Sequence, residues 1–548
     1  MATAKQKKLK SGANAVVQVL LLIGILVAVN VVGVRVFGRV DLTEDKVYTL
    51  SQASRDLAKN LPDRILVKAF ISKDQPARLA QVGRYLRDLL DEYKAASGGK
   101  FQWESIDPAE DKKGEEDAQR LGVPKLRLQE IEKEKVAVKS TYLGIAFEYG
   151  DKTDKIPQIG AQEGLEYQVS SILRRLTVKK KKLGVVSGFG CGDLSNGLRA
   201  VQSGLTDYEV APVNLGGTDA VKIPDDVDAL LVFGPKQPVS EPARKEIDAF
   251  LMKGKSVAFF VDGMALDSPQ GGPQMPGQPA PPKFGKKNDH GLDAMLASYG
   301  FKVNEDMVND DQNVQAAAVI GGQLYFVNQP MYPVATDIST GHRVTEKIKG
   351  IVFPFSSSVE LAGELKDGKA PGKAVALARS TAKAWHQTGF FLYDPQQEMK
   401  QKPGDKREVY TFAYAYEGKL PSAFGRAAGG QSQASEPGLV TESAAPVRML
   451  VVGDSDFASD EQFQHGPRQA MQANFLFMMN AVDWLLQDEA LIGVRGKTLQ
   501  ARPLTVTSES APVLARYGNS LGLPLFFCAY GIVRWRLRRS RRASTTLE

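Results

Sequence analysis

Two long stretches of the chain, one near each end, carry no charged residue. The first covers the 24 residues that follow Lys10, and the second covers the 17 residues from Tyr517 to Val533. A helix of about 20 apolar residues spans the hydrocarbon core of a bilayer. The first stretch is longer than the apolar region of a cleaved signal peptide, and no A-x-A-like cleavage site follows it. We therefore predict transmembrane helices at residues 15–37 and 513–533.

Basic residues flank both stretches. Residues 1–10 carry a net charge of +4 and residues 534–548 one of +5, which leaves −2 of the total of +7 for the rest of the chain. Positive charge marks the cytoplasmic side of a membrane helix. We therefore predict a bacterial inner-membrane protein in contact with lipid, with two spans, cytoplasmic tails at 1–14 and 534–548, and a periplasmic main body. For the second stretch, which contains Pro524, the alternative is a buried core helix with a basic tail.

The composition excludes several classes of protein. Of the 548 residues, 43% are hydrophobic and 24% charged, which is typical of folded domains, and the length suggests two or three of them. Two cysteines and four separated histidines, without HExxH spacing, argue against a disulfide scaffold, an iron–sulfur cluster and the common metal sites. A nucleic-acid-binding domain carries its positive charge on the fold, so we expect no nucleic acid partner.

The region at 41–178 alternates strands and helices in the order of a thioredoxin-like domain. Ile65 to Ser72 reads as a strand, and residues 76–96 follow as a helix with leucines at helical spacing. Thioredoxin-like domains carry a CxxC motif at the start of this helix. Here the sequence reads SKDQPARL at residues 72–79, so redox chemistry is excluded.

The region at 180–490 contains near-continuous apolar strands that alternate with helices, among them DALLVFGP and SVAFFVDG. This pattern is typical of a parallel sheet covered on both faces, so we predict a doubly wound, Rossmann-like domain. Pro- and Gly-rich segments near 268–289 and 421–446 read as mobile loops, and 491–512 reads as a linker. The predicted fold class is thus α/β, with two transmembrane helices flanking a thioredoxin-like and a doubly wound domain.

Nucleotide-binding motifs are absent from the sequence. GFGCGD at Gly188–Asp193 fails G-x-G-x-x-G at its last position and is better explained as a glycine-rich tight turn. The strings that begin at Gly254 and Gly496 read GK[ST] but lack the upstream glycine of a Walker A motif. Cys191 has no activating base placed beside it by any motif. We therefore predict no cofactor and no catalytic residue.

Four acidic residues form the weak candidate site. They follow apolar strands and should gather at the carboxyl edge of the second sheet, where ligands of open α/β sheets bind: Asp193, Asp262, Asp454 and Asp456. Carboxylates there suit a hard cation, but such residues also cap helices and satisfy turn amides, and we weigh capping higher.

Three segments carry a family resemblance. DLTEDKVYTLSQASRDLAKNL, the following ILVKAFIS, and the late VVGDSDFASD and NFLFMMNAVDWL resemble the GldG-type family of gliding-motility-associated auxiliary proteins of ABC transport systems. The resemblance extends over nearly the whole chain. It implies a non-ATPase protein whose partners are an ABC permease and a separate ATPase subunit, and it supplies no catalytic residues.

Together these observations predict a membrane-anchored auxiliary subunit with a periplasmic scaffold or a region that engages a periplasmic or envelope ligand. The competing prediction is a membrane-anchored envelope enzyme, for example a hydrolase that acts at the acidic edge of the second sheet.

Overall fold

A computed structural model describes most of the chain. The described residues are 21, 23–25, 49–110, 112–132, 135–195, 197–217, 221–267, 282–320, 323–394, 397, 401, 405–425, 440–465, 468–487, 492, 494 and 511–544. Most of the predicted first span, of the two predicted loops and of the predicted linker lies outside them. The chain forms two compact units, Met1–Leu499 and Gln500–Glu548, which are treated separately below.

The first unit begins with a four-stranded sheet of order β2-β1-β5-β6. Strands β1 and β2 are parallel, and the other pairs are antiparallel. The apolar residues of α3 recur at helical spacing, and Leu86 and Leu90 are fully buried in the core that it shares with β1. The elements are α2 (Gln52–Lys59), β1 (Ile65–Ile71), α3 (Ala77–Ala96), β2 (Phe101–Ile106), α4 (Lys112–Arg120), β3 (Leu126–Glu132), β4 (Lys135–Thr141), β5 (Leu143–Tyr149), β6 (Lys152–Ile156) and α5 (Leu165–Thr177). The assignment of residues 41–178 to a thioredoxin-like domain stays a prediction.

An eight-stranded sheet follows, of order β17-β20-β23-β24-β10-β9-β7-β8. The strands from β24 to β8 are parallel, whereas β23, β20 and β17 run antiparallel to their neighbours. The prediction of a parallel sheet is therefore corrected to a mixed one, because the chain between β10 and β24 adds antiparallel strands to one edge. The strands are β7 (Lys182–Ser187), β8 (Glu209–Asn214), β9 (Ala229–Phe233), β10 (Ser256–Phe260), β17 (Asp337–Ile338), β20 (Lys373–Arg379), β23 (Thr411–Gly418) and β24 (Val447–Val452).

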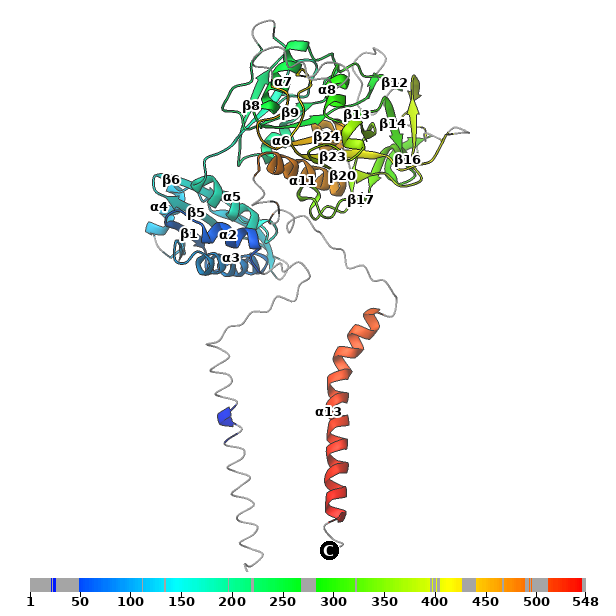
Figure 1. The fold of residues 1–548 in the computed structure, drawn as a ribbon. Helices are drawn as coiled ribbons and strands as arrows, with labels where there is room; N and C mark the ends of the chain where they lie inside the picture. The colour runs from blue at the N-terminus through cyan, green and yellow to red at the C-terminus, as the bar shows by residue number, and fades with distance from the viewer. Residues whose placement is uncertain are drawn as a thin grey trace, which may run out of the picture. The chain divides into compact units, whose positions relative to one another are not determined.

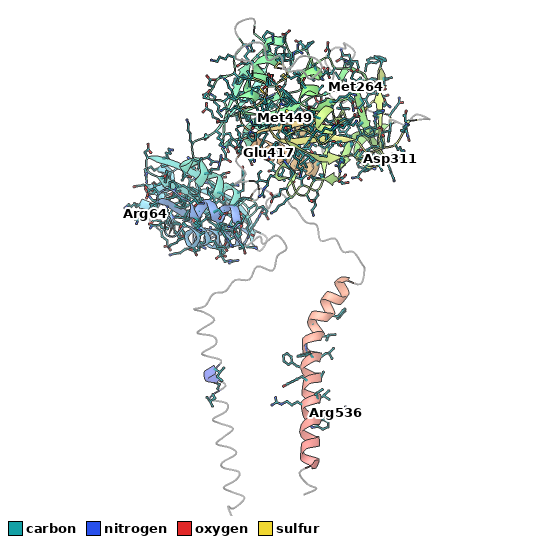
Figure 2. All side chains as sticks on the ribbon, viewed as in Figure 1. Arg64, Met264, Asp311, Glu417, Met449 and Arg536 are labelled. Carbon is teal, nitrogen blue, oxygen red and sulfur yellow. The ribbon has the colours of Figure 1, made fainter. Side chains whose placement is uncertain are left out.

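Helices cover both faces of this sheet. In β10, Ala258 and Phe260 belong to the core that includes α11, while Val257 and Phe259 belong to the core that includes α7, because successive strand residues point to opposite faces. Figure 1 shows α7 and α11 on opposite sides of the sheet, and Met449 of β24, labelled in Figure 2, lies in the α7 core. The helices are α6 (Arg199–Gly204), α7 (Glu241–Met252), α8 (Asp293–Ser298), α9 (Gly363–Lys366), α10 (Asp460–His465) and α11 (Arg468–Leu485), with 3₁₀ turns η1 (Arg343–Thr345) and η2 (Asp456–Ala458).

Several small sheets are inserted between β10 and β24, and their presence makes the protein a mixed α/β structure rather than a simple doubly wound one. Strands β12, β14 and β16 lie together beside the large sheet (Figure 1). The segment 268–289, for which the sequence predicts a mobile loop, includes β12 near its end. This strand pairs with β11 and β22. The strands are β11 (Met264–Asp267), β12 (Lys283–Lys287), β13 (Phe301–Val303), β14 (Asp306–Asn309), β15 (Asn313–Ile320), β16 (Gln323–Ala335), β18 (Ile351–Val352), β19 (Val359–Leu361), β21 (Trp385–Thr388) and β22 (Phe391–Tyr393).

The second unit contains the helix α13 (Ala511–Ser544). Within the described residues, no helix combines the length and the apolar character that crossing a bilayer requires. The uncharged part of α13 is short of the roughly 20 apolar residues needed, and Ser520 and Pro524 dilute it further before the arginine-rich end. The predicted fold class with two transmembrane helices is corrected by this finding, and so is the inner-membrane localisation that depended on it.

Asn474 of α11 is the buried polar side chain that fixes η2 against the helix. Its Oδ1 accepts a hydrogen bond from the Val352 amide at 3.0 Å, and its Nδ2 donates to the carbonyl oxygens of Val352 and Phe457 at 2.8 and 2.9 Å. These bonds satisfy three backbone groups in the interior of the protein.

We expect Asn474→Ala to lower the free energy of unfolding by roughly 3 kcal/mol or more, because each buried polar group left unpaired costs about 1–3 kcal/mol. Urea denaturation followed by circular dichroism measures the change. Gln472→Ala is the matched control, since this amide lies exposed on the same helix. Equal stability of the two variants would contradict the clamping role of Asn474.

Candidate functional site

The carboxyl ends of β10 and β24 meet because the two strands are parallel neighbours. Asp262 lies two positions after the end of β10, and Asp454 and Asp456 follow β24. Asp262 and Asp456 line one cavity, and Asp454 directly precedes Ser455, whose amide donates a hydrogen bond to Asp262. Three of the four predicted edge residues are thus brought to one place.

Asp262 holds the two strand ends together. Its Oδ1 accepts a hydrogen bond from the Ser455 amide at 2.7 Å, and its Oδ2 accepts one from the Ser455 hydroxyl at 2.5 Å. Gly234, with φ +59°, lies against the same serine, because an added Cβ would come within 2.5 Å of the Ser455 Oγ. Burial raises the pKa of Asp262, while the bonds from Ser455 oppose that rise. Both oxygens of Asp262 are therefore used to stabilise the fold.

Asp454 is fully buried and acts as a cap. Its Oδ1 accepts a hydrogen bond from the Phe457 amide at 3.0 Å, at the start of η2, whereas its Oδ2 has no hydrogen-bond partner among the described residues. Burial, and then the negative charges of Asp456 and Asp262, raise its pKa well above the usual range. Its surroundings therefore favour the protonated form of Asp454.

Asp456 differs from these two residues because it lines a cavity. It is half-buried, and no hydrogen bond to its carboxyl group restricts it within the described structure. Burial and the charge of Asp262 raise its pKa to about 7, Glu461 adds to the rise, and Lys236 and Lys283 oppose it. Asp456 therefore changes its charge near neutral pH.

The cavity has a volume of about 160 Å³. Charged residues of both signs converge on it from separate elements, and the rings of Tyr332 and Phe355 form part of its wall, with centroids 4.8 Å apart. Met264, labelled in Figure 2, is among its apolar residues. The lining residues are Lys236, Asp262, Met264, Ala265, Leu266, Asp267, Lys283, Asn288, Met307, Tyr332, Phe355, Asp456, Glu461 and Gln462.

Sequence reasoning missed the two lysines and the aromatic residues of this cavity. Lys236 follows the end of β9 just as Asp262 follows β10, so its position after an apolar strand was a usable signal. Lys283 lies in the Pro- and Gly-rich segment predicted as a mobile loop, and no local pattern marks it. Tyr332 and Phe355 reach the cavity only through the pairing of the small sheets.

Asp193 lies apart from the cavity lining. Its Oδ1 accepts hydrogen bonds from the amide and the hydroxyl of Ser195, at 2.8 and 2.6 Å, as in a turn stabilised by its own side chain. The preceding glycine-rich loop is a tight turn, with positive φ at Gly188, Phe189 and Gly190. Burial raises the pKa of the Cys191 thiol to about 12, which disfavours the reactive thiolate.

The described residues contain no group of three histidine, cysteine, aspartate or glutamate side chains arranged to hold a metal ion. The hard-cation site that the four acidic residues suggested is therefore not formed by them. What remains is a cavity with two ammonium groups, several carboxyl groups and two aromatic rings, an arrangement suited to a small polar molecule.

Comparisons with known proteins cover most of the chain. The family described as an ABC-type uncharacterized transport system matches residues 180–481, more than half of the chain, and a domain of unknown function matches residues 44–148. An uncharacterized protein of Borreliella burgdorferi is 22% identical over 517 residues, which cover 91% of this chain and 93% of that protein. The mmIFT52 N-terminal domain, a solved structure, is 12% identical over 56% of this chain and 97% of its own, with a TM-score of 0.33, too low to support a shared fold.

The pKa of Asp456 predicts a pH-dependent effect of its replacement. The folded-state pKa, about 7, lies above the ordinary aspartate value of 3.8, so the folded protein retains a proton that the unfolded chain has lost. The contribution of this carboxyl group to the free energy of unfolding therefore falls as the pH rises from about 4 to 7. Asp456→Asn removes this loss, and we expect it to raise the free energy of unfolding at pH 8 by roughly 2–4 kcal/mol, with a gain that shrinks towards pH 4.5.

Thermal unfolding at several pH values measures this effect. Asp367→Asn serves as the control, because Asp367 is exposed and does not line the cavity. A pH-independent change in the Asp456→Asn variant, or a loss of stability at pH 8, would show that the carboxyl group is ionised without penalty.

Proposed function

The chain belongs to the family of auxiliary proteins of ABC-type transport systems, and we propose that it serves such a system as a non-catalytic subunit that binds a small polar ligand. The accessory role follows from the family. The ligand-binding role is supported by one observation, the cavity at the carboxyl ends of β9, β10 and β24.

The position of the cavity supports binding rather than a purely structural role. Ligands of open α/β sheets bind outside the carboxyl ends of the strands, where loops supply side chains without disturbing the core. Lys236 and Asp456 are 220 positions apart in the sequence and line the same cavity. Placing these charged groups beside methionines and aromatic rings costs desolvation free energy. A ligand that pairs with the charges would account for their presence.

The partners that we propose are a permease and a separate ATPase subunit. The sequence has no Walker A motif, so the chain could use the energy of ATP only through another subunit. Within the family, the segments that resemble GldG-type proteins support the same arrangement, and membership of that gliding-motility group is part of the proposal.

A hydrolase acting at the acidic edge is the second candidate. It is favoured by Asp456, because a carboxyl group with a pKa near 7 is suited to proton transfer at neutral pH. The described lining residues include no serine, threonine, cysteine or histidine, so such an enzyme would rely on the carboxyl groups, the two lysines and Tyr332. In an enzyme of this kind Asp456→Asn would abolish turnover, whereas an accessory subunit would keep its partners.

Co-purification tests the proposal. The chain is affinity-tagged, expressed from its native chromosomal locus and extracted in mild detergent. We expect it to co-purify with a permease and an ATPase subunit in near-stoichiometric amounts. Asp456→Asn and the control Asp367→Asn should both retain these partners, because neither change alters the backbone of the fold. Recovery of the chain alone, under conditions that keep permease–ATPase pairs intact, would reject the accessory-subunit role.

A further inference from the structure

We propose that the cavity binds a small zwitterion, a molecule of amino-acid size that carries one ammonium and one carboxylate group. The inference rests on the proposed ligand-binding function and names the chemical class of the ligand. It depends on three properties of the cavity, namely its size, the distribution of its charges and the character of its wall.

The volume limits the size of the ligand. A cavity of about 150 Å³ accommodates a molecule such as benzene. The cavity here, at about 160 Å³, has room for roughly six to ten non-hydrogen atoms by the same comparison. This excludes nucleotides, oligosaccharides and peptides as fully enclosed ligands, and it fits a single small amino acid or a similar amino-carboxylate.

Two lysines supply the cationic side. The Lys283 Nζ lies 6.0 Å from the centroid of the Phe355 ring, and within the described structure neither Lys236 nor Lys283 forms an ion pair. By contrast, Lys286 on the same strand is paired with Asp267, and Lys287 with Glu305. Of these lysines, the two that line the cavity are therefore the ones available to a carboxylate ligand.

Acidic residues supply the opposite side. Asp456 and Glu461 line the cavity together with the side chain of Asp262. The groups that act on Asp456 are Asp262 after β10, Lys236 after β9, Lys283 on β12 and Glu461 on α10. Despite the two lysines, the pKa of Asp456 is raised, which means that a further positive charge beside it would be favourable. An ammonium group provides that charge and would favour the ionised form of Asp456.

The mixture of charges decides the class of ligand. An anion without a positive group would be repelled by the carboxyl groups, and a cation without a negative group would be repelled by the lysines. The rings of Tyr332 and Phe355, together with Met264 and Met307, offer apolar contact to a short carbon chain between the two charges.

Binding to the purified full-length chain tests the proposal directly. The probes are glycine, β-alanine and γ-aminobutyrate, which separate the two charges by increasing distances, with acetate and methylammonium as single-charge probes. Isothermal titration calorimetry at pH 8 should show saturable binding of at least one zwitterion, and no binding of either single-charge probe at the same concentration. Affinity should fall at least threefold at pH 6, where Asp456 is mostly protonated.

Variants locate the binding. Lys283→Gln, Lys236→Gln and Asp456→Asn should each weaken binding of the zwitterion at least tenfold at pH 8. Lys287→Gln is the matched control, because this lysine is on the same strand as Lys283 and neither it nor its partner Glu305 lines the cavity, and it should change affinity less than twofold. Thermal unfolding without ligand verifies that each variant is folded.

Absence of binding by all three zwitterions, equal binding of acetate or methylammonium, or equal effects of the Lys283 and Lys287 replacements would each overturn the inference. The result is independent of co-purification. Partners without zwitterion binding would reject the ligand class alone, whereas zwitterion binding by a chain that recovers no partner would reject the accessory-subunit role.

Discussion

The parallel pairing of β10 with β24 is the contact on which the rest of the candidate site depends. It joins two strands separated by nearly 190 residues and brings Asp262 to Ser455, where two hydrogen bonds connect the strand ends. A parallel pair needs a crossover, and in this chain the crossover contains the small sheets. The same pairing therefore aligns the carboxyl ends of β10 and β24 and places segments of the crossover beside them, where they form the cavity wall.

The three carboxyl groups at this edge share an environment but have different roles. Asp262 and Asp454 use their oxygens for the Ser455 and Phe457 backbone groups, so their burial is compensated at least in part by hydrogen bonds. Asp456 has no such bond within the described structure and faces the cavity. Function at this edge is accordingly expected from Asp456 and the lysines opposite it, while its two neighbours keep the strand ends in place.

The membrane topology is where reasoning from local composition failed. A run of uncharged residues predicts a span, yet α13 combines this run with polar residues, a proline and an arginine-rich end. The segment that includes Lys283 shows the opposite error. Its Pro- and Gly-rich composition predicted a loop, but pairing with β11 and β22 makes its last residues a strand, because neighbouring strands supply partners that the local sequence does not reveal.

The sequence by itself determined the positions of the apolar strands, the acidic residues that follow them and the absence of nucleotide and redox motifs. These properties depend on local periodicity and on residue type at fixed spacing, which neighbouring residues along the chain are enough to establish. Only the tertiary structure decided that the sheet is mixed, that Asp193 stays apart, and that Lys236, Lys283 and Tyr332 share a cavity with Asp456. Those outcomes require contacts between segments far apart in the chain, and such contacts follow from the packing of the whole fold.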